Sequence, residues 1–74
     1  MKQRVDNDSL IILHLNTMMS YLINKKRCTY EDAMELVLLS KTYHALLADN
    51  LYRNQGSLYI LNDFIAEYNQ VLQA

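Results

Sequence analysis

Apolar residues recur at helical spacing in the first third of the chain. They fall three and four positions apart, as on one face of an α-helix. The residues of this stripe are Ile11, Leu15, Met18 and Leu22. Because Asp8 or Ser9 can cap the start, we predict a helix from there to about Asn24. Residues 1–7 are polar, and we expect them to be frayed and flexible.

The middle of the chain carries two further helical patterns. Thr29 opens "TYED", a variant of the capping box, and predicts the start of a second helix. Its apolar face is formed by Met34, Val37 and Leu38, with Ala33 and Leu36 beside them. A third segment, about 41–51, is expected to bury Tyr43, Leu46 and Leu47. Ser40 and Thr42 offer a cap between the two segments, and the pattern fits either two helices or one kinked helix over 30–51.

A polar break, "NQGS", separates these helices from the last one. Gly56 is the only glycine, and we expect it to end a helix with a positive φ angle. Ser57 can then cap a helix that runs to about Leu72. The apolar stripe of this helix is Leu61, Ile65, Tyr68 and Leu72, with Ile60, Phe64 and Val71 alongside. No apolar–polar alternation is present, so the sequence predicts an all-α domain over 1–74, a compact bundle of three to four helices.

The composition predicts that this chain associates with a second copy of itself or with another protein. It has 74 residues, of which 51% are hydrophobic, and so small a domain buries a modest core. Cys28 is the only cysteine, so no disulfide can staple the fold. A lone cysteine and a start without a signal-peptide pattern predict a cytoplasmic protein. The apolar runs are too short to cross a membrane.

Neither catalysis nor metal binding is expected. His14 and His44 lie thirty residues apart in the sequence, and neither has an aspartate, glutamate or cysteine three or four residues further on, whereas a zinc site needs three or four convergent ligands. The carboxylates of Glu31, Asp32 and Glu35 fall in the first turns of a predicted helix, where the helix dipole favours negative charge. We therefore predict that the chain is no enzyme and holds no cofactor.

A DNA-binding helix-turn-helix is the main alternative. Ser40 and Thr42 can form a turn before a second helix, as in proteins whose second helix enters the major groove. The residues that would face DNA are Lys41, Thr42, His44 and Arg53. The usual turn glycine is replaced by Val37 or Leu38, and the net charge is −1. Binding to nucleic acid is therefore a secondary prediction, because phosphate contacts need cations.

The end of the chain, "GSLYILNDFIAEY", resembles the C-terminal signature of a family of small uncharacterised bacterial proteins. The matching residues of its Gly-x-x-Tyr-Ile-hydrophobic-x-Asp block are Gly56, Tyr59, Ile60, Leu61 and Asp63. The layout of the preceding helices is also similar. The loop before the glycine departs from the family, which often has a histidine near Tyr52 and one residue fewer. The resemblance implies a bacterial helical domain of unknown function, encoded in some members near toxin-like genes, and it assigns no site residue.

Together these patterns predict a non-catalytic protein–protein interaction module. The wide apolar face of the first helix is the expected interface, either with a second copy in a homodimer or with another protein. Its residues are Ile11, Leu15, Met18, Met19 and Leu22. Tyr21 and Tyr68 can rim it, because tyrosine has an apolar body and a polar tip. The alternative is a small DNA-binding regulator or antitoxin-type protein.

Overall fold

The computed structural model describes residues 7–73, and side chains within 8–70, as a chain of helices with no strand among them. The five helices of this part are α1 (Asn7–Lys25), α2 (Tyr30–Leu39), α3 (Lys41–Ala48), α4 (Asn50–Arg53) and α5 (Ser57–Gln73). The all-α prediction is confirmed. The predicted count of three to four helices is wrong, because the expected third helix is divided into α3 and α4.

The first helix begins earlier than predicted. Asp8 and Ser9 lie inside α1 and so do not cap it from outside. Most of the segment 1–7, which was expected to be flexible, lies outside the described residues. At its other end α1 is followed by Arg27, whose φ of 60° is left-handed. The Cys28 N–H then donates to the Leu22 carbonyl at 3.1 Å, a bond typical of the Schellman motif at helix C-termini.

Two hydroxyl side chains set the boundaries of α2. The Thr29 hydroxyl accepts a hydrogen bond from the Asp32 N–H at 3.1 Å, which confirms the predicted cap. Ser40 is extended, with φ −74° and ψ 151°, and its hydroxyl accepts from the Tyr43 N–H at 3.0 Å. The same hydroxyl donates to the Val37 carbonyl at 2.7 Å. Ser40 thus ends α2 and starts α3, so these are two separate helices.

A second polar side chain interrupts the predicted helix over 41–51. Asp49 leaves the helical conformation, with φ −121° and ψ 109°. Its Oδ1 accepts from the N–H groups of Leu51 and Tyr52, at 3.0 and 3.2 Å. An aspartate that satisfies free backbone donors in this way favours a new helix start over a continuous helix.

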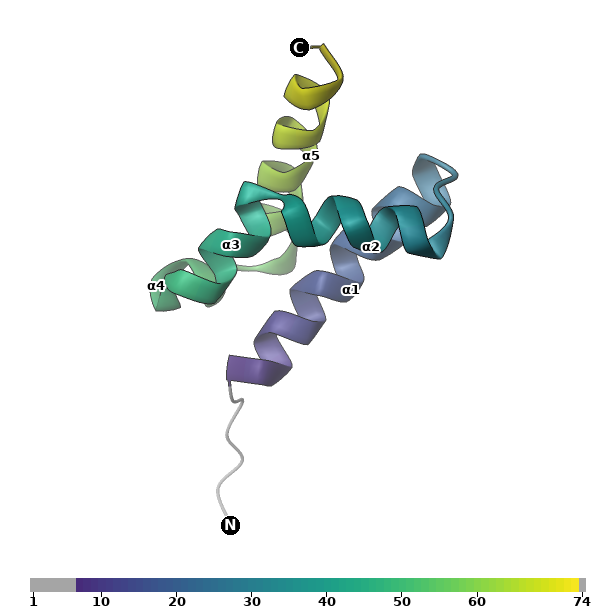
Figure 1. Cartoon of the computed structure of the whole chain (residues 1–74). Coiled ribbons are helices and arrows are strands. Elements are labelled where there is room, and N and C mark those ends of the chain that lie inside the picture. Colours follow the sequence, from purple (N-terminus) through teal and green to yellow (C-terminus); the bar gives the residue numbers. More distant parts are fainter. Residues whose placement is uncertain (1–6, 74) are drawn as a thin grey trace.

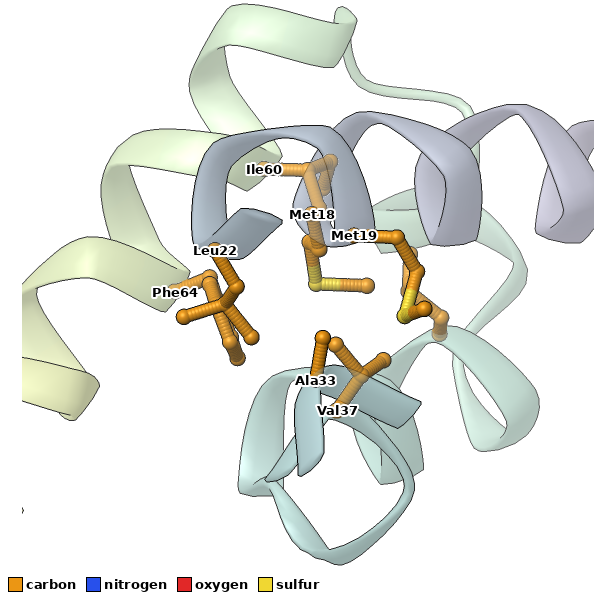
Figure 2. Packing of buried hydrophobic residues seen from close by; sticks show 8 residues of the cluster. Met18, Met19, Leu22, Ala33, Val37, Ile60 and Phe64 are labelled. Carbon is orange, nitrogen blue, oxygen red and sulfur yellow. The ribbon is translucent and has the colours of Figure 1, made fainter. Parts of the chain in front are cut away.

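The core lies where α1 is crossed by the other helices. Figure 1 shows α2 lying across α1, and α1 contacts each of the other four helices. Figure 2 shows side chains of α1, α2 and α5 converging on a common interior. The buried apolar residues are Met18, Met19, Leu22, Ala33, Val37, Leu46, Ile60 and Phe64. On α5 the most buried positions are therefore Ile60 and Phe64, and not the predicted stripe centred on Leu61 and Ile65.

Gly56 does not adopt the positive φ that the sequence predicted. It directly precedes α5, and its carbonyl accepts from the Ile60 N–H at 3.1 Å, as the residue before a helix does. A Cβ placed on it would meet no atom within 4 Å beyond its chain neighbours. Glycine is therefore not required at this position.

We predict that Gly56→Ser stabilises the protein by about 0.5–1 kcal/mol. A serine restricts the unfolded chain and supplies a hydroxyl acceptor before α5. Chemical denaturation of the two proteins measures the change, with Gly56→Ala as a control that restricts the chain without adding the acceptor. A loss of more than about 1 kcal/mol in both variants would mean that Gly56 is left-handed in solution.

At Arg27 the reverse substitution, from a larger residue to glycine, is predicted to stabilise the protein. A non-glycine residue in the left-handed region carries strain of about 1–2 kcal/mol, and glycine removes it. Arg27→Gly should therefore raise the free energy of unfolding by up to about 1 kcal/mol after its own entropy cost. Arg27→Ala removes the same charge but keeps the Cβ, so it should give no such gain. Equal effects of the two substitutions would assign the change to charge.

Candidate functional site

Three of the five residues of the predicted interface on α1 do not lie on the surface. Met18 and Leu22 are 0% exposed and Met19 is 6% exposed, so these three residues form the core of the chain itself. Ile11 and Leu15 are half-buried. The prediction of a five-residue interface is corrected for a physical reason. Because α1 is the central helix, its wide apolar face is covered by the other helices of the same chain.

The two tyrosines expected to rim that interface hold a lysine of their own chain. The rings of Tyr21 and Tyr68 meet edge to face, with centroids 6.5 Å apart. Lys26 Nζ lies 5.9 Å from one ring centroid and 5.8 Å from the other. A cation at this distance from an aromatic face is attracted by the ring quadrupole. These contacts among the two rings and the lysine link the C-terminal end of α1 to α5.

The start of α3, where DNA contacts were predicted, is occupied by a carboxylate. Glu67 of α5 accepts from the backbone N–H groups of Lys41 and Thr42, at 2.6 and 3.0 Å. It also accepts from the Thr42 hydroxyl at 2.9 Å. Thr42 is 5% exposed, whereas Lys41 and His44 are exposed. A phosphate approaching this helix start would meet a negative charge where a free helix start offers N–H donors.

The fourth predicted DNA contact, Arg53, points into the protein. It is 6% exposed, and its Nε and Nη1 find no hydrogen-bond partner within the described residues. Its carbonyl accepts from His14 Nε2 at 2.8 Å. His14 is 1% exposed and forms a buried link between α1 and α4. The helix-turn-helix prediction also fails at the turn, since Ser40 alone joins α2 and α3 where three to four residues are usual.

The described residues offer no metal-binding cluster. Within residues 7–73, no three or more histidine, cysteine or acidic side chains come together in a way that could hold a metal ion. Cys28 is a half-buried free thiol. None of the described helices has the length and apolar character needed to cross a bilayer.

Several exposed apolar side chains line a hollow on the outer side of α2. A shallow groove there is lined by Tyr30, Glu31, Met34, Glu35, Leu38 and Leu39. Leu39 is 72% exposed, Tyr30 64% and Leu38 40%. In the described part of the chain α2 contacts only α1 and α3, so its outer side has no covering helix. We call this surface the α2 groove.

The sequence placed Leu38 on the buried face of α2, and this is wrong. The buried face consists of the small or medium side chains of Ala33, Val37 and Ser40, at helical spacing. Small side chains on the inner face allow α2 to pack closely on α1, and the longer side chains then point outward. The helical spacing of Ala33, Val37 and Ser40 indicates the buried face in the sequence. The greater hydrophobicity of the leucines favours a different face, the one that includes Leu38.

Two carboxylates run along the α2 groove. Glu31 and Glu35 are exposed and lie one helical turn apart. Neither forms an ion pair with a cation in the described part of the chain. Helix α2 has no basic residue among YEDAMELVLL, so the groove combines an apolar floor with an uncompensated negative charge.

The C-terminal block that carries the family resemblance fastens α5 to α4. The Tyr52 hydroxyl donates to Asp63 Oδ2 at 2.7 Å, and the rings of Tyr52 and Tyr59 meet edge to face with centroids 6.3 Å apart. Burial, reinforced by the hydrogen bond to Asp63 and its negative charge, raises the pKa of Tyr52 well above its ordinary value of 10.0. Ile60 of the same block lies in the core. These contacts give the block a structural role.

Tyr52 makes stability depend on alkaline pH. A raised folded-state pKa means that the folded chain holds this proton more tightly than the unfolded chain. The resulting stabilisation is full below about pH 10 and is lost as the pH rises above it. We predict that the free energy of unfolding falls more steeply above pH 10 in the parent chain than in Tyr52→Phe. Denaturation between about pH 9 and 12 tests this.

Tyr30→Phe is the matched control for that series. Tyr30 is 64% exposed, and its hydroxyl makes no hydrogen bond within the described residues. Its removal should leave the pH dependence of the parent chain unchanged. Parallel curves for the parent chain and Tyr52→Phe would contradict the assignment.

Comparison of the chain with protein-family models, with curated protein sequences and with solved structures found no match. The resemblance of the last block to a bacterial family therefore stays a prediction.

Proposed function

We propose that this chain is a non-catalytic protein–protein interaction module that binds through the α2 groove. The observation that carries the proposal is the exposure of Leu38 and Leu39 on one uncovered helix face, beside the half-buried Met34. Contiguous apolar surface rimmed by polar residues is typical of interaction sites on small soluble proteins. The role predicted for the apolar face of α1 is thus transferred to α2.

The energetics of the chain support the same proposal. Only eight apolar side chains make up the buried cluster of the described part. Burying two further leucines and a methionine against a partner would remove apolar area comparable with a sizeable share of that core. A domain with so little interior gains more from such a contact than a larger domain does.

The DNA-binding or antitoxin-type alternative has less support. Of its four predicted contacts, Thr42 and Arg53 are buried, and Glu67 places a negative charge beside the start of α3. Lys41 and His44 alone would have to supply the contacts to phosphate. We place the proposed function in the cytoplasm, in keeping with the lone cysteine.

Substitutions at two exposed leucines test the proposal. Leu38→Ser and Leu39→Ser are combined in one double variant. Each substitution should change the free energy of unfolding by less than about 0.5 kcal/mol, since both side chains are exposed. Association of the double variant should be at least about tenfold weaker than that of the parent chain, because the two leucines of the parent chain fill the contact. Sedimentation measures self-association, and affinity capture compares the proteins retained by each variant.

The matched control is Leu51→Ser, which removes a leucine that is 77% exposed and lies outside the groove. It should behave like the parent chain in both measurements. Equal retention of the same partners by the double variant and the parent chain would contradict the proposal. Tight binding to duplex DNA at about 50 mM salt, lost steeply as the salt rises, would favour the DNA-binding alternative.

A further inference from the structure

The geometry of the α2 groove points to one kind of occupant: we propose that it binds an amphipathic helix of a partner protein, with two basic side chains one turn apart beside its apolar face. This inference rests on the proposed function and makes it more specific. The spacing and the charge of the groove residues support it. So does the lack of a strand in residues 7–73, because an extended peptide would need an open strand edge.

The groove residues form two parallel rows along α2. Tyr30, Met34 and Leu38 follow each other at intervals of four residues and form an apolar row. Glu31 and Glu35 form an acidic row beside it, which Leu39 continues. Residues four apart lie above one another on a helix, so each row runs along the axis for about two turns. An occupant must therefore present a matching apolar row beside a matching row of positive charge.

A helix meets this requirement better than an extended peptide does. Extended peptides bind mainly by adding a strand to the open edge of a sheet, where unpaired backbone groups await them. Residues 7–73 contain no strand, and the backbone groups in the middle of α2 are engaged within its own helix. A helical occupant satisfies its own backbone and needs only side-chain contacts, with anchors spaced three and four residues apart.

The charge of the groove selects a basic occupant. Glu31 lies in the first turn of α2, where the helix dipole accounts for it. Glu35 lies beyond the first turn, where that effect has faded, and it has no cation partner in the described residues. Two basic side chains one turn apart would pair with both carboxylates. Each exposed pair contributes little to affinity, so the pairs mainly set the orientation and choice of partner.

A second copy of the chain is a poorer occupant. Two α2 grooves placed face to face would bring together two helices that each carry three acidic residues and no basic one. Like charges at close range weaken such a contact. Lys26, which precedes α2 in the chain, does not line the groove and lies against the rings of Tyr21 and Tyr68. The charge pattern therefore favours a different, basic protein over self-association through this face.

Two synthetic helical peptides test the inference against the full chain. Both carry the same row of leucines, one with lysines at two positions one turn apart beside that row and the other with glutamates there. Fluorescence anisotropy at about 50 mM salt should show at least about tenfold tighter binding of the lysine peptide. Glu31→Lys combined with Glu35→Lys should reverse this preference. Leu38→Ser should weaken the binding of whichever peptide each protein prefers.

Asp32→Lys is the matched control for charge. Asp32 is an exposed acidic residue of the same helix that does not line the groove. If the groove selects the lysine peptide, Asp32→Lys should retain most of the preference. If net charge alone attracts the peptide, Asp32→Lys should lower the preference as much as a single substitution Glu35→Lys does, and the inference is overturned.

The remaining outcomes separate this inference from the proposed function. Equal, Leu38-dependent binding of the two peptides would overturn the basic helix as occupant and leave the interaction module standing. Failure of both peptides, with a dimer that dissociates on Leu38→Ser, would assign the groove to a second copy. Failure of both peptides and a monomer at all concentrations would overturn both proposals.

Discussion

The contact between Glu67 and the start of α3 is the constraint on which the arrangement of the middle helices depends. Helices α3 and α4 have only eight and four residues, and isolated helices shorter than about 12 residues are marginal in water. They persist because α5 supplies their polar partners, Glu67 for the first turn of α3 and Asp63 for the Tyr52 hydroxyl of α4. Since Ser40 alone joins α2 to α3, fixing α3 also fixes which side of α2 faces outward.

Local chemistry explains which parts of the fold the sequence could predict. The caps at Thr29 and Ser40 were predictable, since each depends on a hydroxyl and an N–H three residues away. Asp49 carries the same kind of signal, but it lies in an apolar stretch whose pattern fits one longer helix. At Gly56 the residue type suggested a positive φ that the chain does not adopt, because the glycine serves as the residue before a helix and not as the end of one.

The site was harder to predict, because it depends on which of several apolar faces is buried. With 51% hydrophobic residues, α1 and α2 each present more than one plausible face. The choice is made by the close approach of α2 through Ala33 and Val37, a long-range packing effect that periodicity does not contain. The burial of Thr42 likewise depends on Glu67, which lies 25 residues further along the chain.

The interior also explains why a bound partner would matter to this chain. The described part of the chain buries two polar side chains, Arg53 and His14, in addition to an apolar cluster of only eight residues. Nitrogens of both side chains find no hydrogen-bond partner among the described residues, and this opposes folding. A ligand that binds only the folded state adds stability, about 2.7 kcal/mol when its concentration is 100 times its dissociation constant. For a fold with a small core this is a large fraction of the total. Occupation of the α2 groove would therefore couple recognition of a partner to stability of the fold.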